Sequence, residues 1–307
     1  MLNKKARAVG LAIMAVAVAF LVHRFLSFGV DFAELFTAGA LPGLLFVTAC
    51  TMATFFIASV GWTILLSFFA GKRVPVIPTY GLYMRANIAK YLPGNVGHYA
   101  MRQIYGASLG IKQRDMLVSS VLEIACMAFA AFILSLLLGR DTLLHYLGGA
   151  LRTAWVPPVL VAAVCACVAG AIIFMRKKGF SLSDVTSYFK RKGFPLSVAA
   201  VIGLTMCSLF IYGGTLLFLF GPVPEARANA LLVISASIVS WFVGFVTPGV
   251  PGGIGVREAA LLLMLSPVLP DDIVLHAALL QRLAFVFSDV LSWVAGKAIE
   301  KRDRITD

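Results

Sequence analysis

The sequence predicts an all-α, polytopic membrane protein with six spanning helices, two re-entrant helical hairpins and an inverted-topology repeat. Three observations support this prediction. The 307 residues are 60% hydrophobic and only 13% charged, with a mean hydropathy of +0.94, and a soluble domain of this length could not bury so much apolar surface. Six long apolar stretches follow one another along the chain. Two segments rich in Pro and Gly interrupt patterns that are otherwise helical.

Each apolar stretch is long enough to cross a bilayer, because about 20 apolar residues span about 30 Å of hydrocarbon. Three of the stretches contain no Asp, Glu, Lys or Arg. The first stretch follows a basic N-terminus, as a signal peptide would. No small-residue cleavage pattern follows Phe20, however, and we expect a retained helix. The six predicted spans are 8–28, 44–70, 116–139, 154–175, 195–220 and 272–296.

The basic residues are distributed as topology signals rather than as a nucleic-acid surface. The net charge is +12, and most of the 26 Lys and Arg residues lie before the first span, in 72–114, in 176–192 and in 297–304. Cytoplasmic loops of membrane proteins carry such an excess. Both termini and 176–194 are therefore predicted to be cytoplasmic, which requires an even number of crossings. No nucleic-acid partner is expected.

Two regions outside the spans, 79–114 and 229–270, each contain two short helical patterns around a break. The breaks align as PGNVG at 93–97 and PGGIG at 251–255. As re-entrant hairpins, they divide the chain into halves of approximately 1–140 and 150–300. Each half has three crossings, so the halves would be inverted, as in many secondary transporters. The first hairpin would enter from the cytoplasm and the second from outside. Because Pro-Gly is also a strong turn signal, two ordinary solvent loops are the alternative.

The two breaks also predict a site for an anion. Non-helical backbone at membrane depth needs protein or a water-filled cavity around it, and Gly94 and Gly97 permit positive φ or a close approach of another backbone. Helices that begin near Gly97 and after Gly255 would direct N–H groups and a positive dipole end at a phosphate. With Arg102 and Arg257 nearby, we expect an electropositive cleft. Such a cleft suits a lipid headgroup phosphate whose acyl or isoprenyl tails stay in the bilayer.

The segments YLPGNVGHYAMRQ and PGGIGVREAALLLML resemble the two signature segments of the lysylphosphatidylglycerol-synthase transmembrane, or flippase-like, family. The resemblance extends over nearly the whole chain, and Gly252, Gly253, Gly255 and Glu258 belong to its more specific motif. It implies a bacterial inner-membrane protein that moves an aminoacylated phospholipid or another lipid-linked molecule between leaflets. Full-length relatives add a soluble aminoacyltransferase domain. This chain ends at Asp307, so we expect no synthase activity, and a separate lipid-synthesising enzyme is a candidate partner.

Ionisable residues within the spans are candidate functional residues, because burying them unpaired is costly. We expect Glu123 to pair with a hairpin arginine, for function or for structure. Arg257 and Glu258 diverge by about 100° on a helix, which favours Arg257 facing the substrate phosphate and Glu258 facing another cation. Arg282 and Asp289 share one face of the last span, where they either line the cleft or lock helices together.

The first hairpin is too polar to face lipid. Arg85 and Lys90 either guide headgroups from the cytoplasmic leaflet or extend to the interface. His98 stands where members of the resembled family often have an acidic residue. It either couples movement to protons or only forms hydrogen bonds. The expected substrate-binding residues are Arg85, Lys90, Gly94, Asn95, Gly97, His98, Arg102, Glu123, Gly252, Gly253, Gly255, Arg257, Glu258, Arg282 and Asp289.

These observations predict a lipid translocase that exposes a headgroup site near the midplane alternately to the two leaflets. An uncoupled lipid scramblase and a small-solute or ion secondary transporter are the alternatives. The sequence has no zinc-protease, α/β-hydrolase or P-loop motif. Its four histidines are scattered, and its five cysteines lie in apolar segments without metal-site spacing. We therefore expect no enzymatic activity, metal or cofactor. The expected partners are membrane lipids, and a homo-oligomer is an open alternative.

Overall fold

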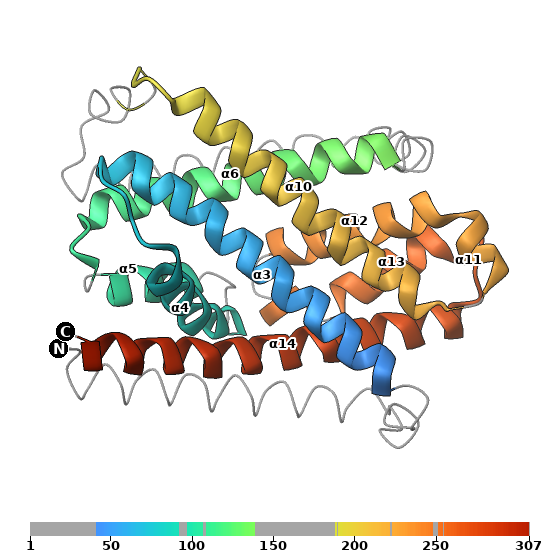
Figure 1. Ribbon diagram of the computed structural model, residues 1–307. Helices are drawn as coiled ribbons and strands as arrows, with labels where there is room; N and C mark the ends of the chain where they lie inside the picture. Colours follow the sequence, from blue (N-terminus) through green and yellow to red (C-terminus); the bar gives the residue numbers. More distant parts are fainter. Residues whose placement is uncertain are drawn as a thin grey trace.

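The computed structural model describes residues 41–91, 97–106, 109–138, 188, 190–221, 223–247, 251–253 and 255–306. All regular elements within these ranges are helices (Figure 1), as the sequence predicts. In chain order they are α3 (Leu41–Ala70), α4 (Val76–Asn87), the 3₁₀ helix η1 (Ile88–Tyr91), α5 (Gly97–Gly106), α6 (Gln113–Leu138), α10 (Phe194–Leu219), α11 (Pro224–Ala228), α12 (Ala230–Val246), the 3₁₀ helix η3 (Pro251–Gly253), α13 (Val256–Leu265) and α14 (Asp271–Thr306).

Four of these helices, α3, α6, α10 and α14, are long and apolar enough to cross a membrane. They begin and end within a few residues of four predicted spans, except that α14 continues to Thr306. Large apolar side chains on their outer faces are exposed, such as Phe129 at 52% and Leu196 at 76%. Apolar faces on helices of this length suit lipid and indicate a membrane protein. The predicted spans 8–28 and 154–175 lie outside the described residues.

Two pairs of short helices form hairpins inside the bundle. The α4–η1 segment packs against α5, and α12 packs against α13. The first hairpin lies at the end where α3 finishes and α6 starts, whereas the second lies at the end where α10 finishes and α14 starts (Figure 1). The two hairpins therefore enter the bundle from opposite ends. Residues 92–96, 248–250 and 254, which belong to the two breaks, lie outside the described ranges.

The described part of the second break is inside the protein. Gly252 and Gly253 are both buried, and their φ angles are +61° and +73°, a conformation that glycine adopts readily. The tips of the two hairpins meet here, because η1 contacts η3. A Cβ atom added to Gly252 would lie 3.1 Å from Cε1 of Tyr91. This segment is thus a junction of packed backbone and not a solvent loop.

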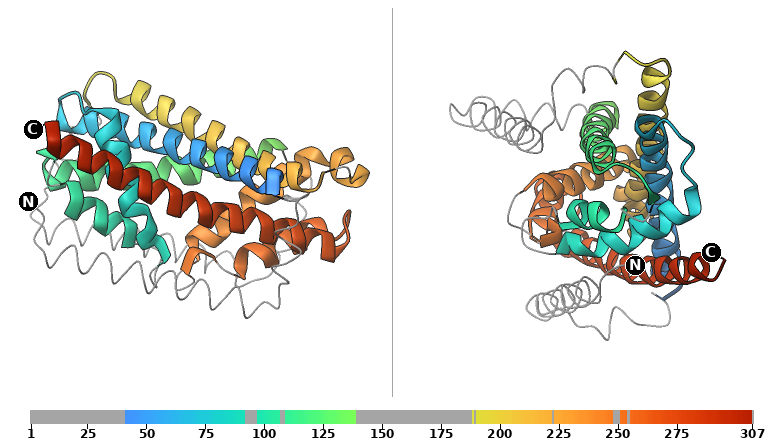
Figure 2. Two further views of the ribbon diagram at one scale, coloured as in Figure 1. Left: turned by 60° about the horizontal axis from the view of Figure 1, so that its bottom comes forward. Right: turned by 90° about the vertical axis from the view of Figure 1, so that its left-hand side faces the viewer.

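The helix α14 runs along both hairpins and along α3. In the left view of Figure 2, α10, α3 and α14 lie side by side as roughly aligned rods. The crossing of α14 and α4 is especially close, since a Cβ atom on Gly296 would lie 2.7 Å from the carbonyl oxygen of Gly81. Two facing glycines thus allow the first hairpin to dock directly on the last helix.

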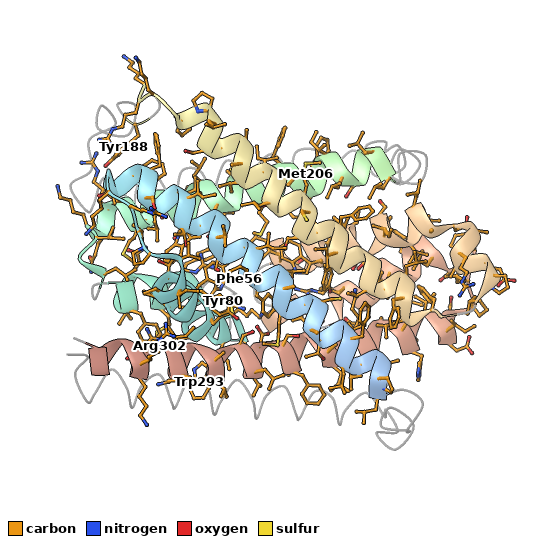
Figure 3. All side chains as sticks on the ribbon, viewed as in Figure 1. Phe56, Tyr80, Tyr188, Met206, Trp293 and Arg302 are labelled. Atoms are coloured by element: carbon orange, nitrogen blue, oxygen red, sulfur yellow. The ribbon has the colours of Figure 1, made fainter. Side chains whose placement is uncertain are left out.

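Basic residues gather at one end of the bundle. Tyr188 and Arg302 lie at this end in Figure 3. Tyr188 donates a hydrogen bond of 2.7 Å to Asp115, and burial together with this bond raises the pKa of its phenol, which therefore stays neutral. The described basic residues of the helix ends and loops here are Lys72, Arg73, Lys112, Arg114, Lys190, Arg191, Lys192, Lys301 and Arg302; the opposite end carries Glu225, Arg227, Asp271 and Asp272.

Candidate functional site

A cavity of about 130 Å³ lies where the two hairpins meet. Its walls come from α3, α6, α10, α14 and both hairpins. The lining that α6 and α10 contribute mixes apolar residues, such as Met127, Val201 and Leu209, with polar ones, such as Glu123, Thr205 and Ser208. The predicted site residues that line the cavity are Lys90, His98, Arg102, Glu123, Gly252 and Arg257, and the structure adds the aromatic residues Phe55, Tyr83, Tyr99, Tyr212, Trp241, Phe245 and Phe285.

Asp289 of α14 anchors the tip of the first hairpin. Its carboxylate, on a side chain that is 1% exposed, accepts hydrogen bonds from Asn87 (2.9 Å), Lys90 (2.7 Å) and Tyr91 (2.6 Å). The Lys90 ammonium also lies 4.1 Å from the centroid of the Phe285 ring. The Lys90–Asp289 ion pair satisfies both charges within the protein, as buried charges require. Lys90 is therefore held in a buried ion pair with Asp289 and is not an exposed side chain that could guide headgroups.

Arg102 and Glu123 form a second buried ion pair, with 2.5 Å between Nη1 and Oε2. The Tyr83 hydroxyl donates to the other carboxylate oxygen at 3.0 Å, and the Arg102 guanidinium lies 3.7 Å from the Tyr83 ring centroid. Arg102 is only 1% exposed. The predicted pairing of Glu123 with a hairpin arginine is therefore observed.

Arg282 of α14 anchors the second hairpin. Its guanidinium donates to Glu258 at 3.0 Å and to the carbonyl oxygen of Gly252 at 2.8 Å. The other oxygen of Glu258 accepts the backbone N–H of Gly255 at 2.7 Å. Glu258 thus faces a cation, as predicted. The Gly255 N–H, which was expected to face a ligand anion, donates instead to the Glu258 carboxylate.

Lys90, Arg102, Arg257 and Arg282, together with their carboxylate partners, form a charged cluster where the hairpins meet. Arg257 differs from the other three cations of this cluster. It forms no ion pair with a described residue, whereas Lys90, Arg102 and Arg282 each have a carboxylate. Its stem lies beside Gly244 and Gly253. Its guanidinium lies 5.3 Å from the ring centroid of Phe285 and borders the cavity. Among the described residues, these four cations and the three carboxylates of Asp289, Glu123 and Glu258 leave one net positive charge at the junction of the hairpins.

The remaining predicted site residues are His98, Gly97, Gly255, Gly94 and Asn95. His98 is 5% exposed, its ring lies 3.9 Å from that of Tyr99, and its Nδ1 has no hydrogen-bond partner among the described residues. Gly97 begins α5, and Gly255 precedes α13 with φ of +84°. Gly94 and Asn95 lie outside the described ranges.

Arg85 is not brought to the cavity. It forms an ion pair with Glu300 and lies 5.0 Å from the ring centroid of Tyr105, next to the glycine crossing of α4 and α14. Its inclusion among the substrate-binding residues stays a prediction that these contacts do not support. An acidic residue in the extension of α14 attracts it, and that extension lies beyond the predicted span.

The aromatic wall was missed from the sequence, because aromatic residues scattered through apolar spans carry no signal that separates cavity lining from lipid contact. Gln281 was missed as well. It is buried, and its amide nitrogen lies 3.0 Å from the Tyr212 carbonyl oxygen and 2.9 Å from Thr215 Oγ1. A glutamine in the middle of a span would have been a usable signal.

No group of three or more His, Cys, Asp or Glu side chains in the described part of the chain is arranged to hold a metal ion. In the described part of the chain, paired charges, one arginine without a carboxylate partner (Arg257) and aromatic rings surround a small cavity. It is suited to binding an anion. In comparisons with family models, curated proteins and solved structures, the chain matches none of them.

Proposed function

We propose that this protein is a flippase-like lipid translocase that moves a phospholipid or lipid-linked molecule between leaflets, with the headgroup passing through the cavity between the hairpin tips. The observation that supports this most strongly is the unpaired Arg257 at that cavity. Arginine binds phosphate with a planar fork of N–H donors. Met127, Val201 and Leu209 add apolar surface to the lining of the same cavity. A lipid matches both features, because its phosphate can bind the arginine and its apolar part can contact the apolar residues.

The proposal places the chain in the inner membrane of a bacterium. It gives the protein six spanning helices, including 8–28 and 154–175, and makes both hairpins re-entrant. The end of the bundle rich in Lys and Arg would face the cytoplasm under the positive-inside rule, and the termini would lie there. The order of a long helix, a pair of short helices and another long helix from α3 to α6 and again from α10 to α14 supports this arrangement. Inverted repeats with broken helices that meet near the midplane suit alternating access.

The resemblance to the lysylphosphatidylglycerol-synthase transmembrane family supports the same function. Two residues of its more specific motif have defined places in the fold: Gly252 accepts from Arg282, and Glu258 pairs with the same arginine. These residues hold the second hairpin on α14. They would therefore maintain the site rather than bind the lipid directly.

A transporter of small anions is the second candidate, because a cavity of about 130 Å³ would hold a free anion as well as a headgroup. Efflux of radiolabelled phosphate from proteoliposomes separates the two functions. A lipid translocase should release no more phosphate than empty vesicles, whereas a small-anion transporter should empty them.

Neutralisation of Arg257 tests the proposal. Arg257→Gln should lower the rate at which a fluorescent phosphatidylglycerol crosses a reconstituted membrane by at least about tenfold, since a hydrogen bond to a charged group contributes about 1.5–3 kcal/mol. The rate is measured by quenching of the outer leaflet with dithionite. Arg227→Gln changes an exposed arginine at the opposite end and should match the wild type. Wild-type rates for the Arg257 variant would remove this residue from the site.

Arg257 is a cleaner target than Arg102. Loss of Arg102 would leave Glu123 as a buried, uncompensated carboxylate, which destabilises the fold. Loss of Arg257 leaves no described carboxylate unpaired. Reduced transport by the Arg257 variant can therefore be assigned to the site rather than to unfolding.

A further inference from the structure

We propose that the cavity selects a headgroup with one net negative charge, such as a phosphodiester with a neutral alcohol, and rejects an aminoacylated headgroup that carries an added ammonium. This inference rests on the proposed function and narrows its substrate class. It is drawn from the charges and hydrogen bonds of the described residues around the cavity.

The carboxylates of the cluster are already used by the protein. Asp289 accepts three side-chain hydrogen bonds. Glu123 accepts from Arg102 and Tyr83, and Glu258 accepts from Arg282 and the Gly255 N–H. A ligand ammonium would find no free carboxylate among them, and burial of an unpaired ammonium is costly. An ammonium on the headgroup is therefore disfavoured.

The unsatisfied polar atoms at the cavity are chiefly donors. Nε of Arg102 and Nε of Arg257 have no hydrogen-bond partner in the described part of the chain, and neither does Nδ1 of His98. The two arginine atoms can only donate, and the histidine nitrogen donates in one of its tautomers. A phosphodiester brings acceptor oxygens and one negative charge. It complements both the excess of donors and the net charge of the cluster.

Aromatic rings could bind a ligand cation, but the rings here already face cations of the protein. Phe285 lies 4.1 Å from the Lys90 ammonium and 5.3 Å from the Arg257 guanidinium. The Tyr83 ring faces Arg102. A further cation beside these rings would meet like charges. The aromatic wall therefore does not form a cage for a quaternary ammonium or lysyl headgroup.

Headgroup selectivity is measured in phosphatidylcholine proteoliposomes that contain trace fluorescent phosphatidylglycerol, lysylphosphatidylglycerol or phosphatidylcholine. The wild type should move phosphatidylglycerol at least about tenfold faster than the lysyl lipid, a ratio that corresponds to one well-placed charged hydrogen bond. Arg257→Gln should lose this preference, and Arg257→Lys, which retains the charge, should keep part of it. Arg227→Gln should behave as the wild type.

The outcomes separate the two proposals. Movement of none of the three lipids by the wild type would reject lipid translocation itself. Equal rates for all three, or faster movement of the lysyl lipid, would retain translocation and reject the selectivity. Unchanged selectivity in Arg257→Gln would reject Arg257 as its source. Thermal unfolding in detergent gives a second readout: phosphatidylglycerol should raise the melting temperature of the wild type more than the lysyl lipid does, and equal shifts would also reject the inference.

Discussion

At the scale of single residues, Arg257 reaches the cavity because two glycines leave room beside its stem. A Cβ atom on Gly244 would lie 2.5 Å from Cγ and 2.9 Å from Nε of Arg257, and one on Gly253 would lie 3.0 Å from Nε. A side chain at Gly244 would therefore require the Arg257 side chain to shift. The direction of the arginine is thus determined by the helix opposite, α12, as well as by its own helix.

Gly244→Ala should displace the Arg257 guanidinium while keeping its charge. We expect lipid movement to fall severalfold, because hydrogen bonds weaken steeply when their geometry is distorted. The measurement is the proteoliposome rate for phosphatidylglycerol. Gly203→Ala on α10 is the matched control, since a Cβ atom there meets no described atom within 4 Å. If both variants moved lipid at the wild-type rate, the position of the guanidinium would be irrelevant.

At the scale of elements, α14 holds both hairpins through opposite charges. Asp289 binds the tip of the first hairpin through Asn87, Lys90 and Tyr91. Arg282 binds the second through the Gly252 carbonyl and Glu258. The residues share a face of α14, as the sequence predicts, yet they do not pair with each other. Of the two predicted roles, locking helices together is the one that these contacts support.

Asp289→Asn should destabilise the protein, because it leaves the buried Lys90 ammonium without its carboxylate. Removal of one partner of a buried ion pair costs about 3–5 kcal/mol, so the melting temperature in detergent should fall by several degrees. The double variant Lys90→Met, Asp289→Leu should recover part of this loss, since neither charge of this pair is then left buried without its partner. Glu225→Gln, at an exposed residue of α11, should melt as the wild type. A double variant no more stable than Asp289→Asn would argue against the ion pair as the cause.

At the scale of the whole molecule, the two ends of the bundle differ in charge. One end carries the basic residues that flank α3, α6, α10 and α14, and the other carries Glu225, Asp271 and Asp272 beside Arg227. Positive charge marks the cytoplasmic side of membrane proteins. This charge asymmetry of the described residues supports the proposed orientation.

Cysteine labelling tests this orientation. In a variant with all five native cysteines replaced, Glu225→Cys should react with a membrane-impermeant maleimide in intact cells. Lys301→Cys should react only after lysis, because we place it on the cytoplasmic side. Labelling of both positions from outside would contradict an arrangement in which these ends face opposite compartments.

The limits of four long apolar helices and the positions of the two pairs of short helices could be predicted from the sequence, because long apolar runs and Pro-Gly pairs are local signals. The partners of the charged residues were harder to predict. Glu123 was expected to meet a hairpin arginine and does. Arg85 was expected near the substrate, but it pairs with Glu300, more than 200 positions away. The hydrogen bond from the Gly255 N–H to Glu258, at the start of the same helix, was not predicted. A Gly-rich break followed by a helix is equally typical of a helix start that binds an external anion.

The spacing between Arg282 and Asp289 has a mechanical consequence. Seven positions on an α-helix correspond to two turns, or about 10 Å along the axis. Each residue holds the tip of a different hairpin, so the spacing between the two tips depends on one helix rather than on loops. A displacement of one tip is transmitted through that helix to the other. The positions of the two hairpin tips are thereby mechanically linked.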